Sequence, residues 1–313
     1  MAAPSSSSAT PPKPRRRRLK RWMKITGATV LVFGLGSCSL TKRLVAEAIV
    51  HPQRKGVGAP VPEDLTARTF KLPDGVELRT WEARPAGPPK AAVLVLHGIS
   101  DSKATQVETL RFLARRGIMA MAPDMRAHGD SGGQFATYGY VEKNDLSLLR
   151  KVVEKEFSKL QVGLWGTSYG GAIALQAMSI DDQFDFAIIE STFADLRDVA
   201  RAQVVSHTTL PVSWLGPYMM NEAGKLASFD PGQVSPEHSM EKIKVPILHM
   251  HGVNDEIIPI DQGRRIASHS HDPNYRFVEI PKGTHFGLKA GDPKKYDEEV
   301  KAFLDKVVGP APE

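Results

Sequence analysis

The chain has 313 residues, 41% of them apolar, which is enough for one large domain with its own core. Ten of its 41 Lys and Arg residues lie within residues 1–43, where there is no Asp or Glu, so residues 44–313 carry 31 basic against 35 acidic side chains. This larger part is therefore mildly acidic, which argues against a nucleic-acid partner. A single cysteine excludes an internal disulfide.

The N-terminal segment has the composition of an export signal. Residues 1–14 are rich in Ser and Pro, a basic run follows, and residues 25–36 are apolar. The single cysteine, Cys38, ends the stretch "LGSC", which resembles the lipobox of bacterial lipoproteins. We expect residues 1–38 to be a lipoprotein-type signal that attaches membrane lipid at Cys38, and the protein to be exported and membrane-anchored. An uncleaved signal anchor and a buried cysteine without lipid are the alternatives.

Residues 39–65 are expected to be a linker, and residues 66–308 the main domain. Two β-rich runs joined around Pro-Asp-Gly predict an antiparallel hairpin over 66–84. Beyond it, apolar runs predict strands, and apolar residues spaced by three and four predict helices. The expected order is strand 91–98, helix 105–117, strand 118–124, helix 140–157, strand 161–165, helix 170–178 and strand 184–190.

This alternation stops over residues 192–240, which contain short helical patterns and no convincing strand. It then resumes with strand 245–252, helix 261–269, strand 275–280 and helix 292–308. An insertion between a strand and the next strand–helix unit is typical of a cap or lid. We therefore predict an α/β fold, with a mostly parallel central sheet, helices on both faces and a small helical cap.

The stretch "GLWGTSYGGAIAL" places Ser168 where a strand turns sharply into a helix. A serine in such a turn has a strained backbone and needs small neighbours, which Gly166 and Gly170 provide. Capping of the helix by the serine is the simpler alternative. Two later loops follow strands and supply an acid and a base, Asp255 in "HMHGVNDEIIP" and His285 in "IPKGTHFG".

With these loops the chain resembles α/β-hydrolase-fold serine hydrolases, in particular the prolyl-oligopeptidase-like and serine-aminopeptidase-like branch with its small esterases and acylglycerol lipases. The resemblance covers residues 66–308 and is carried by "LVLHGIS", "PDMRAHGDSGG", "GTSYGG", "HGVNDEIIP" and "GTHFG". It implies that Ser168 is the nucleophile, that His285 is general base and then acid, and that Asp255 orients the imidazole.

The resemblance further implies an oxyanion hole made by two backbone N–H groups, those of Tyr169 and Ile99. The loop that holds Ile99 reads "HGIS", which argues against the hormone-sensitive-lipase type of esterase with its HGGG sequence. Phe193, Trp214, Tyr218 and Met219 in the cap are expected to line an apolar acyl-binding slot. Alternatively, these side chains only pack the cap onto the rest of the domain.

Several other polar residues could be mistaken for reactive groups. "GDSGG" around Ser131 matches the nucleophile sequence of chymotrypsin-like proteases, but that fold and its residue order are absent, so we expect a structural loop. Glu190 is the alternative acid, since some members of the fold place the carboxylate after that earlier strand. We expect His97, Asp124 and His128 to order loops. We expect His249 and His251 to alternate across a strand, which places them poorly to share one metal ion. We predict no metal and no cofactor.

We interpret the chain as a serine hydrolase that cleaves carboxylic ester bonds through an acyl-enzyme, with a small-molecule ester or peptide as substrate. A peptidase or aminopeptidase is second, because no propeller-like segment precedes the domain, whereas larger prolyl oligopeptidases use one to select peptides. Acyl transfer to an acceptor other than water shares the first half-reaction. A catalytically silent lipoprotein scaffold on the same fold is a further alternative.

Overall fold

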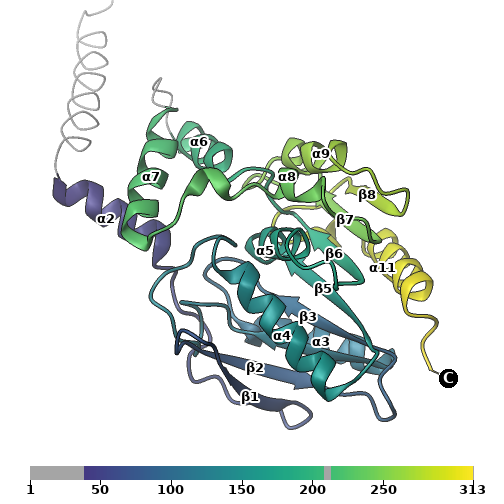
Figure 1. Ribbon diagram of the computed structural model, residues 1–313. Helices are drawn as coiled ribbons and strands as arrows, with labels where there is room; N and C mark the ends of the chain where they lie inside the picture. The colour runs from purple at the N-terminus through teal and green to yellow at the C-terminus, as the bar shows by residue number, and fades with distance from the viewer. Residues whose placement is uncertain (1–38, 208–212, 313) are drawn as a thin grey trace, which may run out of the picture. The chain divides into compact units, whose positions relative to one another are not determined.

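The central element of the computed structural model, which describes residues 39–207 and 213–312, is one eight-stranded sheet (Figure 1). The strand order is β1-β2-β4-β3-β5-β6-β7-β8. Pairs β1–β2 and β2–β4 are antiparallel, and all later pairs are parallel. The strands are β1 Thr66–Lys71, β2 Glu77–Ala83, β3 Ala91–Leu96, β4 Ile118–Pro123, β5 Gln161–Thr167, β6 Phe186–Glu190, β7 Ile247–Gly252 and β8 Tyr275–Ile280.

Helices cover both faces of this sheet, as the fully apolar strands require. Side chains of β3 alternate between two buried clusters: Leu94 and Leu96 face one, and Val93 and Val95 face the other. The first cluster packs against α4 Glu142–Glu156, α5 Tyr169–Met178 and α9 Ile260–Ser268, and the second against α3 Val107–Arg115 and α11 Pro293–Val307. The predicted fold class is confirmed.

Within residues 192–240, the described part contains helices and no strand. It comprises α6 Leu196–His207, α7 Leu215–Ala227, the short 3₁₀ turn Pro231–Gln233 and α8 Pro236–Met240. Helices α6 and α7 lie side by side, and a third apolar cluster joins them to the beginning of α5 through Phe193, Met220 and Ala172 (Figure 1). Three further elements complete the part of the chain that the structure describes: α2 Ser39–Val50, a 3₁₀ turn at Lys103–Gln106 and α10 Leu288–Gly291.

The residues expected to form a linker at 39–65 instead contain α2 and a segment with specific contacts. The chain divides into two units at 45/46, and the larger unit begins inside α2. Ala46 and Val50, one helical turn apart, are buried in that unit. The Val50 carbonyl accepts a hydrogen bond from the Ala136 N–H, and the Ile49 carbonyl accepts one from the Tyr138 hydroxyl. This apolar spacing of four distinguishes α2 from a linker.

Among the helices of residues 39–207 and 213–312, none has the length and apolar character that crossing a bilayer requires. Cys38 and the apolar run 25–36 lie outside the described residues.

The contact of α5 with the end of β3 gives a test of the fold. A Cβ atom on Gly170 would lie 2.5 Å from the Leu96 carbonyl oxygen, so Gly170→Ala must push strand and helix apart. We expect the free energy of unfolding to fall by about 1–3 kcal/mol, measured by urea denaturation. Gly87→Ala is the control, because a Cβ atom there meets nothing within 4 Å. Equal effects of the two substitutions would contradict this packing.

Candidate active site

Ser168 occupies the turn between β5 and α5 with a backbone conformation that few residues adopt. Its φ of 54° and ψ of −115° lie outside the usual regions for an L-residue. A Cβ atom on Gly166 would lie 2.5 Å from the Gly170 carbonyl carbon, which explains the small residues around the serine. The turn is fixed by the bond from the Ser168 N–H to the Glu190 carbonyl (2.8 Å) and by the bond from the Thr192 hydroxyl to the Ser168 carbonyl (2.7 Å).

The loop after β8 brings His285 to this serine. The Nε2 atom of His285 lies 3.0 Å from Ser168 Oγ, and its Nδ1 atom lies 2.8 Å from Asp255 Oδ2. An ionised carboxylate can only accept, so Nδ1 carries a proton and Nε2 of the neutral ring accepts from the serine hydroxyl. Three side chains from three strand ends thus form one continuous hydrogen-bonded chain.

The Asp255 carboxylate is held by its own loop. Its Oδ1 atom accepts hydrogen bonds from the backbone N–H groups of Ile257 (3.0 Å) and Ile258 (2.8 Å). Burial alone acts to raise the pKa of Asp255, but the bonds from His285 and Ile258 outweigh it and the pKa is lowered. Asp255 therefore stays ionised and can stabilise a positive charge on His285.

A second histidine supports the same loop from behind. The Nε2 atom of His251 lies 2.8 Å from the Ile258 carbonyl oxygen, which can only accept, so this nitrogen carries the proton. It is also 3.6 Å from Asp255 Oδ2. Burial lowers the pKa of His251, so its ring is neutral beside the carboxylate. The expectation that His249 and His251 alternate across the strand is wrong, because residues two apart share one face of a strand, and their ring centroids lie 6.1 Å apart.

The loop after β3 is oriented by His97, a fully buried side chain. Its Nε2 atom accepts from the Met125 N–H (3.0 Å), so its Nδ1–H donates to the Gly98 carbonyl (2.7 Å). Because the C=O and N–H of a trans peptide point in opposite directions, this bond directs the Ile99 N–H away from His97. A Cβ atom on Gly98 would be 3.9 Å from Ser168 Cβ, so the loop lies beside the serine.

Tyr169 begins α5 directly after the serine, and its side chain is held in place by a residue that sequence reasoning missed. Its hydroxyl donates to Glu142 Oε1 (3.1 Å). Glu142 also accepts from the Thr137 N–H and hydroxyl and from the Gly139 N–H. The N–H groups of the first helical turn have no partner within the helix, so the Tyr169 N–H is available beside Ser168. No spacing rule links Glu142 to Tyr169, because they lie 27 residues apart.

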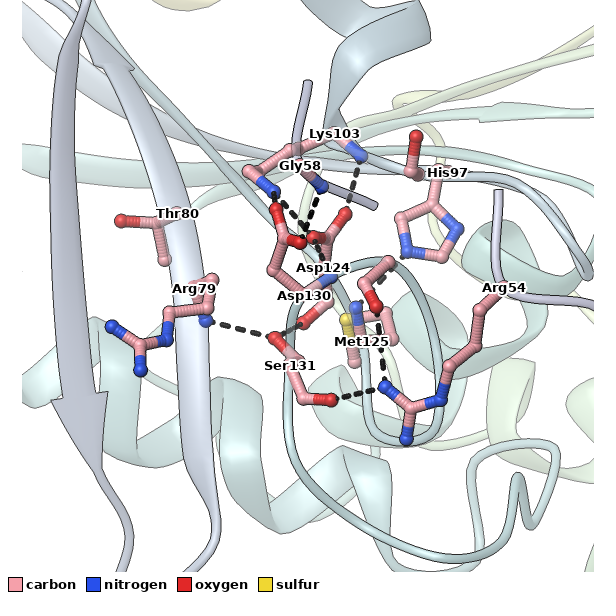
Figure 2. Close-up of polar contacts among 12 residues, drawn as sticks. Arg54, Gly58, Arg79, Thr80, His97, Lys103, Asp124, Met125, Asp130 and Ser131 are labelled. Carbon is pink, nitrogen blue, oxygen red and sulfur yellow. Dashed lines mark hydrogen bonds and ion pairs between the residues drawn. The ribbon is translucent and has the colours of Figure 1, made fainter. Parts of the chain in front are cut away.

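Ser131, the second serine in a G-x-S-x-G sequence, is buried and hydrogen-bonded within its loop. Its hydroxyl donates to the Asp124 carbonyl (2.6 Å) and accepts from the Arg79 N–H (2.8 Å), as Figure 2 shows. Lys103 lies between Asp124 and Asp130 in the same view, with its ammonium 2.5 and 2.8 Å from their carboxylates. Ser131 therefore helps to fix the loop that carries His128.

Glu190, the alternative acid, is also engaged elsewhere. It accepts hydrogen bonds from the Trp165 indole (3.1 Å), the Thr167 hydroxyl (2.9 Å) and the Tyr296 hydroxyl (2.5 Å). Burial raises its pKa, although these three donors oppose the change. Glu190 joins β5 to α11, whereas Asp255 contacts His285.

The remaining predicted site residues have different environments. Phe193 and Met219 are buried, Phe193 within the apolar cluster of the cap, whereas Trp214 is 54% exposed and its ring centroid lies 6.2 Å from that of Tyr218. Their contact with substrate stays a prediction, and the lipid site Cys38 lies outside the described residues. Within the described ranges, no group of three or more His, Cys, Asp or Glu side chains could hold a metal ion.

Comparison with known proteins agrees with this architecture. The sequence model of the prolyl oligopeptidase family matches residues 104–311. The protein YqkD of Bacillus subtilis is 23% identical over 78% of this chain and 81% of its own length. The solved esterase Pf2001 of Pyrococcus furiosus superposes with a TM-score of 0.68 at 24% identity, over 83% of this chain and 99% of its own. A puromycin-hydrolyzing peptidase of Mycobacterium tuberculosis gives a TM-score of 0.61 at 20% identity, over 80% of this chain and 40% of its own.

The two buried acids can be distinguished by isosteric amides. In Asp255→Asn one oxygen becomes an NH2 group, so the side chain can no longer accept both from His285 and from the backbone N–H groups of its own loop, and the ring loses its preferred tautomer. We expect turnover of a p-nitrophenyl ester to fall by about 10³–10⁴-fold. Glu190→Gln keeps an oxygen acceptor beside Trp165 and Thr167, and we expect a loss below about tenfold. A larger loss in Glu190→Gln than in Asp255→Asn would reverse the assignment.

Proposed function

The chain belongs to the prolyl oligopeptidase family, and from this premise we propose that it is a serine hydrolase that cleaves carboxylic ester bonds with Ser168, His285 and Asp255. The observation that carries the proposal is the unbroken chain of hydrogen bonds from Ser168 Oγ through the His285 ring to Asp255. A serine hydroxyl is a weak nucleophile until a neighbouring base accepts its proton. His285 Nε2 is within hydrogen-bonding distance for that transfer.

In the first half-reaction, Ser168 Oγ attacks the ester carbonyl carbon while its proton passes to His285 Nε2. Asp255 stabilises the resulting imidazolium through Nδ1–H. The carbonyl oxygen becomes an oxyanion, and the Ile99 and Tyr169 N–H groups are the donors proposed to bind it. The intermediate collapses when the C–O bond to the alcohol breaks, and the alcohol leaves with the proton of His285. Ser168 then carries the acyl group.

In the second half-reaction, water replaces the alcohol. His285 takes a proton from the water, whose oxygen attacks the acyl carbon to form a second oxyanion. The bond to Ser168 Oγ breaks, Oγ recovers the proton from His285, and the carboxylic acid is released. No redox change occurs, so the two steps need no oxidant or reductant.

An ester substrate is favoured over a peptide by the extent of the structural matches. The chain superposes on 99% of the Pyrococcus esterase but on 40% of the Mycobacterium peptidase. Peptide or amide cleavage is the second candidate, supported by the family match over residues 104–311. The first half-reaction is the same for both, and the leaving group is an amine instead of an alcohol.

A fluorophosphonate probe tests the nucleophile directly, because it reacts with activated serines. We expect the protein to be labelled and Ser168→Ala to remain unlabelled, with ester turnover lowered by about 10³-fold or more. Ser131→Ala is the matched control, since it removes the serine of the other G-x-S-x-G sequence, and it should keep its label. Labelling that survives in Ser168→Ala and disappears in Ser131→Ala would refute the proposal.

We also propose that the protein is exported and held at a membrane by residues 1–38, through lipid on Cys38. The basic run, the apolar run 25–36 and "LGSC" support this assignment. Mass spectrometry of protein from a membrane fraction should find a mature N-terminus at Cys38 that carries diacylglycerol. An intact N-terminus in the membrane fraction would instead indicate an uncleaved anchor, and recovery only in the soluble fraction would exclude both.

A further inference from the structure

An extended segment after α2 is hydrogen-bonded to the loops after β3 and β4, two neighbouring strands on one side of β5 and Ser168. The Gln53 N–H donates to Ser100 Oγ (3.2 Å), in the loop after β3. Arg54 donates to the carbonyls of Gly129 (3.2 Å), Ser131 (2.5 Å) and Gly133 (2.8 Å), part of which Figure 2 shows. We call residues 51–59 the strap.

The strap also contacts the ion pair between Asp130 and Lys103. The Gly58 N–H donates to Asp130 Oδ1 (2.8 Å), and Asp130 Oδ2 accepts from Lys103 (2.8 Å). Lys103 is buried and directly follows the loop after β3 (Figure 2). A Cβ atom on Gly56 would lie 2.4 Å from Ser102 Oγ, so the strap backbone lies against this loop. The strap therefore lies against the loop that borders Ser168.

Exposed apolar side chains lie in the strap and in the loops after β3, β7 and β8. Phe286, next to His285, is 91% exposed, and Val57 in the strap is 60% exposed. Val253 and Ile257 flank Asp255, and Ile99 follows Gly98; each of the three is between 36% and 38% exposed. We call these five side chains the apolar collar. Exposed apolar groups gathered at one place on a surface indicate a binding partner.

The length of chain before the strap indicates which partner is within reach. Helix α2 has 12 residues, and three further residues lead to Gln53. Residue 38 and Gln53 are therefore at most about 30 Å apart along the chain. The segment ahead of α2 combines eight basic residues up to Lys24 with the apolar run 25–36, a composition that favours lipid surfaces. A tether this short keeps the apolar collar at a high local concentration beside any membrane that holds residues 25–36.

We infer that the apolar collar docks the candidate active site onto a lipid surface, and that the substrates are acyl esters presented by that surface. This inference rests on the proposed function and names its substrate class. A chain end leaving the lipid then meets Ser168 without crossing bulk water, because four of the five collar side chains lie in the loops that hold Gly98, Asp255 and His285. Val57 and Phe286 insert among the lipids, and the strap holds the loop after β3 in position as they do so.

Tryptophan substitutions test the docking in the full-length protein mixed with phosphatidylcholine vesicles whose acyl chains carry bromine, which quenches tryptophan fluorescence on contact. We expect quenching of Phe286→Trp to exceed that of Ile180→Trp by at least about twofold. Ile180 is the matched control, because it is 49% exposed and lies between the end of α5 and the start of β6, at the opposite edge of the sheet from Ser168. Equal quenching of the two variants would overturn the proposal. The same result is expected if another protein, and not lipid, covers the apolar collar.

An activity ratio separates this proposal from the proposed function. The ratio compares hydrolysis of p-nitrophenyl palmitate in phosphatidylcholine vesicles with that of p-nitrophenyl acetate in solution. We expect Phe286→Ser and Val57→Ser to lower this ratio by about tenfold, and Ile180→Ser to leave it unchanged. Val57→Ser is included because Phe286 contacts the His285 ring, with centroids 5.1 Å apart. An unchanged ratio in both collar variants would overturn the docking. If the unmodified protein hydrolyses neither ester, the proposed function is refuted instead.

Discussion

The chemistry proposed for this protein depends on the hydrogen bond between His285 and Asp255. It joins the loops after β7 and β8, selects the tautomer of the imidazole, and leaves Nε2 free to accept from Ser168. The surrounding contacts serve to keep this bond in place. Two backbone N–H groups hold the other oxygen of Asp255, and His251 holds the Ile258 carbonyl of the same turn. These bonds orient the three side chains before any substrate arrives, which is the condition for electrostatic catalysis without reorganisation.

The parallel sheet explains why such distant residues meet. Strands β3, β5, β7 and β8 all end at one edge, so the loops that follow them converge there. The proposed nucleophile adds a local constraint: Ser168 keeps a positive φ only because Gly166 and Gly170 allow strand and helix to approach closely. Strain at one residue is thus maintained by packing around it. The antiparallel hairpin β1–β2 lies at the far end of the strand order and takes no direct part.

Much of this arrangement could be predicted from local patterns. Continuous apolar runs identified the buried strands, and the small residues around Ser168 identified the turn, because both signals depend only on neighbours in the chain. Contacts between residues far apart in the sequence could not be predicted from such local patterns. Glu142 binds the Tyr169 hydroxyl across 27 residues, and Arg54 binds three carbonyls more than 70 residues away. The strap lies in a segment expected to be a linker, since nothing in its composition reveals partners so far along the chain. Glu190 illustrates the remaining ambiguity: two carboxylates follow suitable strands, and only the contact of Asp255 with His285 distinguishes them.

The central claim is that Ser168, activated by His285, takes up the acyl group of an ester. It is tested most directly by rapid mixing with p-nitrophenyl acetate, followed by acid quenching and peptide mass spectrometry. The account predicts a burst of about one p-nitrophenol per protein molecule and an acetyl group on the peptide that contains Ser168. An acetyl group found reproducibly on another residue, or turnover with no acylated protein at all, would contradict it.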